Sequence, residues 1–349
     1  FRGFLSNIPS ALLEKYATDC LTDKFDDKGF ALQDIVNEVG HRLGFAVEHG
    51  RYRGTAEGRG HDGAWTFPNQ SRTIVVEVKT TDVYRINLET LEAYRRSLIQ
   101  DADLPAEAVT VLIVMGAEDT AGLEAQIRGS RYAWDVRLIS VGALLRLLHL
   151  KEEAEDPGLV QRIRNILIPR EFTRLDEIIE IAFSAAKDVR EEAEEEAEET
   201  TEVSRKPKFV PVKFHDECIE RVQEKLGLPL VKRTRSMYAT AAGGVAVICS
   251  VSREHEYSGT RSYWFAFHPY QREALSGAQD KFVAFGCGSE SRILLVPFAA
   301  FDTWLEGMNT TFRNDRSYWH VSIFQEDGRF VLHRKKGFER IDLTDYLLE

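Results

Sequence analysis

The chain has 349 residues, of which 43% are hydrophobic and 29% are charged, a balance that excludes a disordered or fibrous protein. This length fits two domains of ordinary size. No run of about 18 uncharged apolar residues occurs, so we expect neither a membrane-spanning segment nor a membrane partner. The four cysteines form no C-x-x-C pair, which argues against a zinc or disulfide framework and predicts a cytoplasmic location.

The net charge of −11 is unevenly distributed along the chain. Residues 1–187 contain 23 basic and 29 acidic residues, and residues 205–349 contain 21 basic and 18 acidic residues. Between them, residues 188–204 contain one basic and nine acidic residues. A negative overall charge argues against nucleic acid as a partner. Because most of the excess lies in one short run, however, it does not exclude DNA.

The first part of the chain alternates between helical and extended patterns. Apolar residues at three- and four-residue steps predict a helix over residues 32–43, and short strands are expected at 45–48 and 61–67. The β-branched segment 73–80 reads TIVVEVKT and predicts a buried strand. The pattern continues with helices at 88–99, 122–134 and 142–155 and strands at 108–115 and 136–141. We therefore expect an α/β fold in which a mixed sheet is covered by helices.

An acidic run, EEAEEEAEE at residues 191–199, separates this region from a second one that is rich in strands. We interpret the run as a solvated helix end and linker, although a DNA mimic that shields a basic surface is an alternative. The predicted units are a first domain with a helical extension, a linker and a second α+β domain, at residues 1–187, 188–212 and 213–349. Strands in the second domain are expected at 243–251, 263–267, 281–286, 293–297 and 319–324, and helices at 216–226 and 298–308.

Charged residues interrupt the apolar strand 73–80. Because side chains alternate across a strand, Glu77 and Lys79 are expected on the same face. Charges in a buried strand are costly unless they pair, bind a metal or open to a cleft. Asp62 begins the preceding strand, and a hairpin can bring it beside Glu77. Two neighbouring carboxylates repel each other, and a divalent cation such as Mg²⁺ relieves this repulsion.

This group of residues predicts phosphodiester hydrolysis. A bound metal neutralises a phosphate oxygen and lowers the pKa of a bound water, which gives a nucleophile at neutral pH. We expect Lys79 to orient that water or to stabilise the charge that develops on the phosphate. The carbonyl of Val78 is expected to complete the metal shell. The alternative interpretation is an internal salt bridge between Glu77 and Lys79 in an inactive sheet.

The residues HD at 61–62 and EVK at 77–79, on the second and third strands after an opening helix, resemble the PD-(D/E)xK nucleases, which include many restriction endonucleases and Mrr-like enzymes. The resemblance spans residues 30–150 and implies a restriction-endonuclease-like mixed sheet flanked by helices. It also implies that Asp62, Glu77 and Lys79 cut DNA with Mg²⁺, for which Mn²⁺ can substitute. His61 stands where the motif name has proline. The opening helix of this family can supply an acidic metal ligand, which would be Glu38 here.

Several further residues are candidates for contacts with nucleic acid. They are Arg51, Arg53, Arg59, Thr80, Arg95, Arg233, Arg235 and Trp264. Each also has an ordinary structural explanation, as part of an exposed loop, a strand end, a solvated helix face or an aromatic core. Tyr94 and Arg96 are alternatives to Arg95 on the same helix. Strand alternation places His61 on the face opposite Asp62, so we expect a structural role for it.

These observations together predict an Mg²⁺-dependent endodeoxyribonuclease of restriction or phage-defence type. Its second domain would recognise a DNA target, a modified base or a small-molecule signal. A double-strand cut needs two active sites, which favours a homodimer, formed through the helices at 157–187. RNA is not excluded as a substrate. Two alternatives stay open: a non-catalytic nucleic-acid-binding module, and a nuclease effector that is activated by a small-molecule ligand or a defence partner protein.

Overall fold

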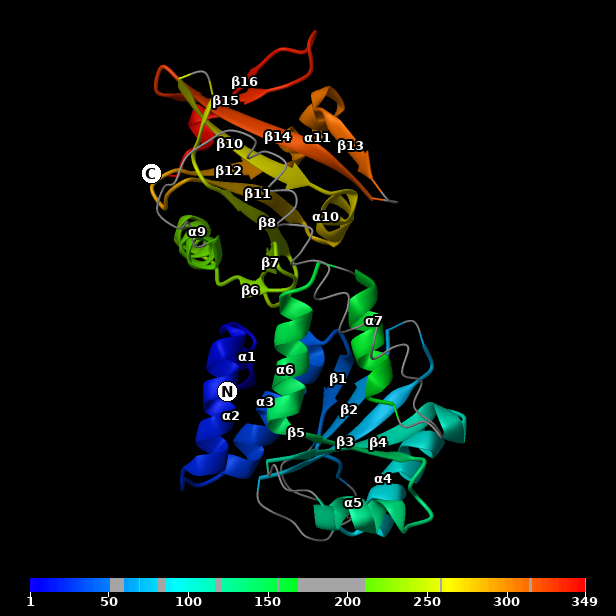
Figure 1. Cartoon of the computed structure of the whole chain (residues 1–349). Coiled ribbons are helices and arrows are strands. Elements are labelled where there is room, and N and C mark those ends of the chain that lie inside the picture. The colour runs from blue at the N-terminus through cyan, green and yellow to red at the C-terminus, as the bar shows by residue number, and fades with distance from the viewer. Residues whose placement is uncertain are drawn as a thin grey trace. The chain divides into compact units, whose positions relative to one another are not determined.

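A computed structural model of the chain describes residues 1–50, 60–68, 70–80, 86–116, 121–155, 157–168, 211–257, 259–313 and 316–348. The chain divides into two compact units, Phe1–Glu199 and Thr200–Glu349, and this division falls within the predicted linker. We call them unit 1 and unit 2. Each unit combines helices with β-sheet (Figure 1), so the expected mixed α/β class is confirmed.

Unit 1 opens with three helices and continues with alternating strands and helices. Its helices are α1 (Arg2–Leu5), α2 (Ser10–Thr22), α3 (Lys28–Arg42), α4 (Leu88–Asp101), α5 (Ala121–Arg128), α6 (Val141–Glu152) and α7 (Pro157–Ile166). Its strands are β1 (Ala46–His49), β2 (Gly63–Thr66), β3 (Thr73–Lys79), β4 (Val109–Met115) and β5 (Val136–Ser140), with a 3-10 turn at Ala106–Ala108. From α3 to α6 this is the order that the hydrophobic pattern predicts.

The strands described in unit 1 form one mixed sheet in the order β1-β2-β3-β4-β5. The pairs β1–β2 and β2–β3 are antiparallel, whereas β3–β4 and β4–β5 are parallel. Helices α3, α6 and α7 pack on the face that contains Ile74, Val76 and Val78. Helices α4 and α5 cover the other face, which contains Val75 and Ile113 (Figure 1). Strand β3 therefore lies between two hydrophobic layers, which explains its nearly continuous apolar sequence.

Two features of unit 1 differ from the sequence-based prediction. Helices α1 and α2 were not predicted, although Leu13 and Ala17 of α2 are buried in the same core as α3. Helix α5 ends at Arg128 and does not continue to residue 134. The hydroxyl of Ser130 donates to the Ile127 carbonyl and accepts the N–H of Tyr132, and this turn replaces further helical bonds.

The described residues of unit 2 form two sheets. The first has the order β16-β15-β14-β10-β9 with β13 paired to β14, and the second has the order β12-β11-β8-β7-β6. The strands are β6 (Val231–Lys232), β7 (Met237–Ala239), β8 (Val245–Ser252), β9 (His255–Tyr257), β10 (Thr260–Phe267), β11 (Asp280–Cys287), β12 (Ile293–Pro297), β13 (Thr310–Arg313), β14 (Arg316–Glu326), β15 (Arg329–His333) and β16 (Ile341–Asp342). The helices are α9 (Pro211–Leu226), α10 (Pro269–Ala274) and α11 (Phe298–Trp304), with 3-10 turns at Leu275–Gly277, Leu305–Gly307 and Thr344–Tyr346.

An aromatic core joins the sheets of unit 2. It includes Tyr263, Phe265 and Phe267 of β10, which are 1%, 3% and 1% exposed. Trp264 lies between them in sequence and is half-buried on the other side of the strand. The predicted alternation along β10 is therefore confirmed. Among the described helices of the whole chain, none has both the length and the hydropathy needed to cross a membrane.

Candidate active site

Strand β3 presents Glu77 and Lys79 on the face of the sheet that α4 covers. They lie two and four residues after the buried Val75, so the three side chains share one face of the strand. The Lys79 ammonium donates to Glu77 Oε1 at 2.5 Å. The Lys79 side chain is 31% exposed and the Glu77 side chain is 13% exposed. They therefore form a partly buried ion pair close to the end of an otherwise buried strand. Their common orientation is the one that the alternation of β3 predicts.

Asp62 lies immediately before β2, and its carboxylate reaches the neighbouring strand. Its main-chain N–H donates to the carbonyl of Val76 at 3.1 Å. Its Oδ2 accepts the main-chain N–H of Val78 at 2.7 Å. Because Val78 stands between Glu77 and Lys79, this hydrogen bond brings the three predicted catalytic residues together at the C-terminal end of β3.

The environment of Asp62 disfavours its negative charge. Burial raises the pKa of this carboxyl group to about 6, and the negative charge of Glu77 adds to the shift. The hydrogen bond from Val78 and the positive charge of Lys79 act in the opposite direction without cancelling it. Two carboxylates that interact in this way gain stability from a bound cation.

The donor atoms suit a hard divalent cation. Carboxylate oxygens of Asp62 and Glu77 and the main-chain carbonyl of Val78 are the kinds of ligand that Mg²⁺ prefers, and Mg²⁺ usually keeps several waters. Within the described ranges, no group of three or more Asp, Glu, His or Cys side chains is arranged to hold a metal by itself.

Helix α4 adds Tyr94 to the surroundings of these residues. Burial raises the pKa of the Tyr94 hydroxyl, and the negative charges of Glu77 and Asp62 raise it further. The main chain of Gly60, two residues before Asp62, and the positive charge of Lys79 lower the pKa of this hydroxyl in turn. Tyr94 is therefore the candidate of the predicted α4 group that faces the carboxylates.

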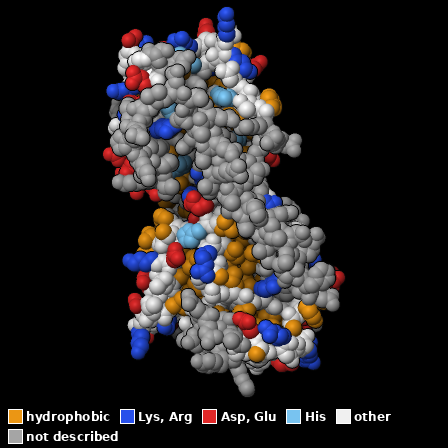
Figure 2. All heavy atoms as spheres, viewed as in Figure 1, with side chains coloured by type: hydrophobic (Ala, Val, Ile, Leu, Met, Phe, Trp, Pro, Cys, Tyr) orange, Lys and Arg blue, Asp and Glu red, His pale blue; other side chains and the backbone are white. Residues whose placement is uncertain are grey.

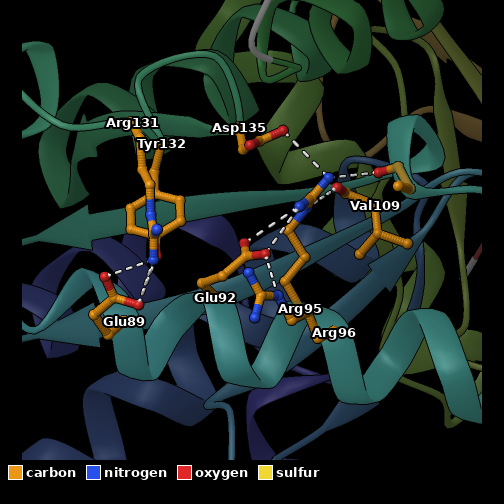
Figure 3. Close-up of polar contacts among 9 residues, drawn as sticks. Glu89, Glu92, Arg95, Arg96, Val109, Arg131, Tyr132 and Asp135 are labelled. Atoms are coloured by element: carbon orange, nitrogen blue, oxygen red, sulfur yellow. Dashed lines mark hydrogen bonds and ion pairs between the residues drawn. The ribbon is translucent and has the colours of Figure 1, made fainter.

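Arg95, the neighbouring residue on α4, has a structural environment (Figure 3). Its guanidinium donates to the carbonyls of Val109 and Ala106, both at 2.6 Å, and forms ion pairs with Glu92 and Asp135, both at 3.2 Å. Arg95 is 7% exposed, so it fastens α4 to the start of β4. The predicted phosphate contact from Arg95 does not fit this environment, and we correct that assignment.

Glu38 of α3 is also occupied by a structural partner. Its Oε1 accepts a hydrogen bond from Arg42 Nε at 2.8 Å. Arg42 is 2% exposed and also donates to Leu5 O, Ile8 O and Ser10 Oγ. The pair therefore ties the N-terminal segment to α3, and it does not support the predicted metal-binding role of Glu38.

The residues of α3 that do contact Asp62 were missed by the sequence analysis. Gln33 and Asn37 each donate a side-chain amide hydrogen to the Asp62 carbonyl oxygen, at 2.8 and 2.9 Å. Both are buried, next to the apolar stripe of the helix. Their spacing of four residues places them on one face and was the available signal, but it also occurs on ordinary solvated helices.

His61 lies closer to the site than expected. Burial lowers the pKa of its imidazole, whereas the negative charges of Glu48 and Glu77 oppose this shift. The expected opposite orientation assumed a regular strand at residue 61, but β2 begins at Gly63. Strand alternation therefore does not apply to His61, and its ring interacts with the charges of the candidate site.

The remaining candidates in unit 1 fall into two groups. Arg51, Arg53 and Arg59 lie outside the described residues. Thr80 directly follows β3 and is half-buried, so its predicted contact with phosphate stays a prediction.

The candidates in unit 2 have local partners. Arg233 donates to the carbonyls of Thr240 and Ala241 at 3.1 and 3.2 Å, and Arg235 lies in the turn between β6 and β7. The indole N–H of Trp264 donates to His320 Nδ1 at 3.1 Å. Figure 2 shows side chains of both charges interspersed on the visible face, and the described ones do not form a continuous basic band there. The roles of these three residues in binding nucleic acid stay predictions.

The sequence matches no protein-family model, and no curated protein matches it. The arrangement of Asp62, Glu77 and Lys79 in unit 1 is therefore the basis for assigning a function.

Proposed function

We propose that the chain is an Mg²⁺-dependent endonuclease whose unit 1 is a restriction-endonuclease-like domain that hydrolyses phosphodiester bonds of DNA. The observation that supports this most strongly is the hydrogen bond from Val78 N–H to Asp62 Oδ2. It joins the Asp62 carboxylate to β3 between Glu77 and Lys79. The order of an opening helix, a strand preceded by Asp and a strand that carries Glu-x-Lys is also the order on which the family resemblance rests.

In this proposal each residue has a separate task. Asp62 and Glu77 hold the divalent cation, together with the Val78 carbonyl. When bound, this cation supplies positive charge to a phosphate oxygen and acidifies a water molecule. The Lys79 ammonium donates hydrogen bonds to the attacking water or to the non-bridging oxygens, where negative charge develops. Tyr94 of α4 would orient the phosphate through its hydroxyl.

The biological setting that we propose is restriction or phage defence. Unit 2 would recognise the DNA target, a modified base or a signalling ligand, and a homodimer would provide the second active site for a double-strand cut. The half-buried Trp264 is the side chain in unit 2 that we expect to stack on a base.

One observation favours a second function, that of a non-catalytic nucleic-acid-binding module. The Lys79 ammonium is bonded to Glu77, which would also be the arrangement of an internal salt bridge in an inactive sheet. The two functions differ in their dependence on metal. A binding module retains nucleic acid without Mg²⁺ and leaves its backbone intact.

A plasmid assay separates the two functions. Supercoiled DNA is incubated with the full chain in Mg²⁺ or Mn²⁺, with and without EDTA, and the same reactions are run with Asp62→Ala and Lys79→Ala. We expect nicked or linear product from the wild type with metal, and intact plasmid with EDTA or either variant. Binding without metal-dependent cleavage by the wild type would favour the binding module, and equal cleavage by folded variants would refute the assigned site.

A further inference from the structure

The main chain at Asp62 is held by two buried amide side chains from α3. Gln33 Nε2 and Asn37 Nδ2 both donate to the Asp62 carbonyl oxygen, at 2.8 and 2.9 Å. The two residues are one helical turn apart, and they are 3% and 0% exposed. The main-chain N–H of Gly50 is a third donor to the same oxygen, at 3.0 Å. The Asp62 carbonyl therefore accepts hydrogen bonds from α3 and from the residue that follows β1.

Neighbouring residues fix the orientation of the Asn37 amide. The indole N–H of Trp65 donates to Asn37 Oδ1 at 2.9 Å, so the NH₂ group is directed to Asp62. The residue after Asp62 is Gly63, and a Cβ atom there would lie 2.1 Å from Asn37 Oδ1. Glycine at this position is thus what allows the amide to approach the chain beside Asp62.

The hydrogen bonds to the Asp62 carbonyl oxygen oppose an electrostatic force that acts on the Asp62 side chain. Its carboxylate is desolvated and is repelled by Glu77, and both effects would decrease if the side chain moved into water. The hydrogen bond from the Val78 N–H to Asp62 Oδ2 is the contact that such a movement would break. A main chain anchored on α3 resists the movement, because α3 itself is packed into the core along its length, from Leu32 to Val39.

We infer that Gln33 and Asn37 are positioning residues, which keep the Asp62 carboxylate against Val78 before metal and substrate bind. The consequence for the reaction rests on the proposed function. The retention of Asp62 itself is a property of the metal-free protein and is measurable without any activity.

Hydrogen exchange of the Val78 amide measures this retention directly. We compare the wild type with Gln33→Met and Asn37→Leu, which keep the approximate side-chain volume and remove the donors. Val36→Ala is the matched control, since it weakens the same helix without touching Asp62. We expect exchange at Val78 to be about 10-fold faster in both amide variants after correction for global stability, and unchanged in the control.

Metal binding gives the second readout. For wild type, Gln33→Met and Val36→Ala, the Mg²⁺ concentration for half-maximal binding is measured by calorimetry and compared with the concentration for half-maximal cleavage. We expect both concentrations to increase about 10-fold in Gln33→Met, with much of the maximal rate recovered at saturating Mg²⁺. In Val36→Ala, a lower unfolding temperature with unchanged metal requirement is expected.

The possible results separate the two proposals. Unchanged exchange at Val78 in both amide variants, or an equal change in Val36→Ala, would overturn the positioning role. If exchange changes as expected while the wild type neither binds Mg²⁺ nor cuts DNA, the positioning of Asp62 stands and the nuclease assignment fails. If Asn37→Leu does not fold, because Trp65 loses its acceptor, Gln33→Met alone decides the question.

Discussion

The buried position of Asp62 carries an electrostatic cost in the folded protein. Its folded pKa of about 6 lies above the ordinary value of 3.8, so folding disfavours the charged form. The contribution of this group to stability is complete below pH 3.8 and is lost as the pH rises through 6. Near neutral pH the buried carboxylate therefore lowers the free energy of unfolding. A bound cation would raise this free energy again.

Asp62→Asn should consequently make the protein more stable and inactive. The amide oxygen can still accept the Val78 N–H, while the charge is removed. We expect the free energy of unfolding at pH 7.5 without metal to increase by ~1–3 kcal/mol, with little change at pH 4. Thermal unfolding at the two pH values checks this. A variant that is less stable than the wild type at pH 7.5 would contradict the electrostatic account.

The effect of Mg²⁺ on the same two proteins provides the complementary test. At pH 7.5 Mg²⁺ should raise the unfolding temperature of the wild type and leave that of Asp62→Asn nearly unchanged. At pH 5 the stabilisation of the wild type should be smaller, because protons compete with the metal for Asp62. Equal stabilisation of both proteins would place the bound Mg²⁺ elsewhere.

The three central residues of the candidate site could be predicted, whereas their supports could not. Glu77 and Lys79 are identifiable because charges are rare in an apolar strand, and Asp62 because it directly precedes the adjacent strand. Gln33 and Asn37 are neutral and lie beside an apolar stripe, so their sequence pattern is that of an ordinary amphipathic helix. Their role depends on where Asp62 lies in space, which spacing along the chain does not reveal.

At the scale of elements, the approach of α3 to β2 depends on small residues. A Cβ at Gly40 would lie 2.4 Å from the Trp65 ring, and one at Gly63 would lie 2.1 Å from the Asn37 amide. These distances are too short for any non-bonded contact between carbon or oxygen atoms. Glycine at the two positions therefore allows α3, which binds the Asp62 main chain, to lie against β2.

Gly63→Ala should accordingly separate α3 from β2. We expect a loss of ~1–3 kcal/mol in the free energy of unfolding, as for overpacked cores, and a loss of metal-dependent cleavage. Gly29→Ala, at the start of α3, is the control, because an added Cβ there meets nothing within 4 Å. Denaturant unfolding and the plasmid assay measure the two effects. A fully active and stable Gly63→Ala would show that this contact is dispensable.

Substitution of Arg95 on α4 tests whether its role is structural or a contact with phosphate. If its guanidinium is structural, Arg95→Met should lower the free energy of unfolding by ~1–3 kcal/mol, since it removes the donor to the carbonyls of Val109 and Ala106, while Arg96 still pairs with Glu92. The slope of DNA affinity against salt concentration should stay the same. Arg96→Met, at a 63% exposed side chain, controls for charge. A salt slope reduced by about one in Arg95→Met would instead indicate a phosphate contact.

The sequence predicted elements best where hydrophobic periodicity was strong. Strands β3 and β4 are buried on both faces and were recognisable from their β-branched residues, and α3 from its apolar stripe. Helices α1 and α2 were missed because fewer of their residues are buried than in α3, so their apolar periodicity is weaker. The end of α5 was misplaced because a local serine turn competes with the helix at Ser130.

At the scale of the whole molecule, the proposal divides recognition and chemistry between two units. The net charge of −11 means that long-range electrostatics oppose the approach of DNA, so local contacts and bound cations must supply the attraction. Trp264 of unit 2 is the aromatic residue that we expect to contribute to such a contact.

Trp264→Ala should therefore weaken substrate binding more than chemistry. We expect the DNA concentration for half-maximal rate to increase about 10-fold, the loss typical of one stacked base, with a smaller change in the maximal rate. Phe338→Ala, another partly exposed aromatic of unit 2, serves as the control. Steady-state cleavage of a labelled duplex measures both parameters. A decrease in maximal rate with unchanged half-saturation would contradict a recognition role.

The most direct test of the account is the single-turnover rate of Mg²⁺-dependent cleavage by Lys79→Met, compared with the wild type and with Lys15→Met, which removes a lysine from the surface of α2. We predict that Lys79→Met remains folded and binds Mg²⁺ but cleaves at least about 100-fold more slowly, while Lys15→Met cleaves at the wild-type rate. Cleavage by folded Lys79→Met at the wild-type rate would contradict the claim that Asp62, Glu77 and Lys79 form the active site.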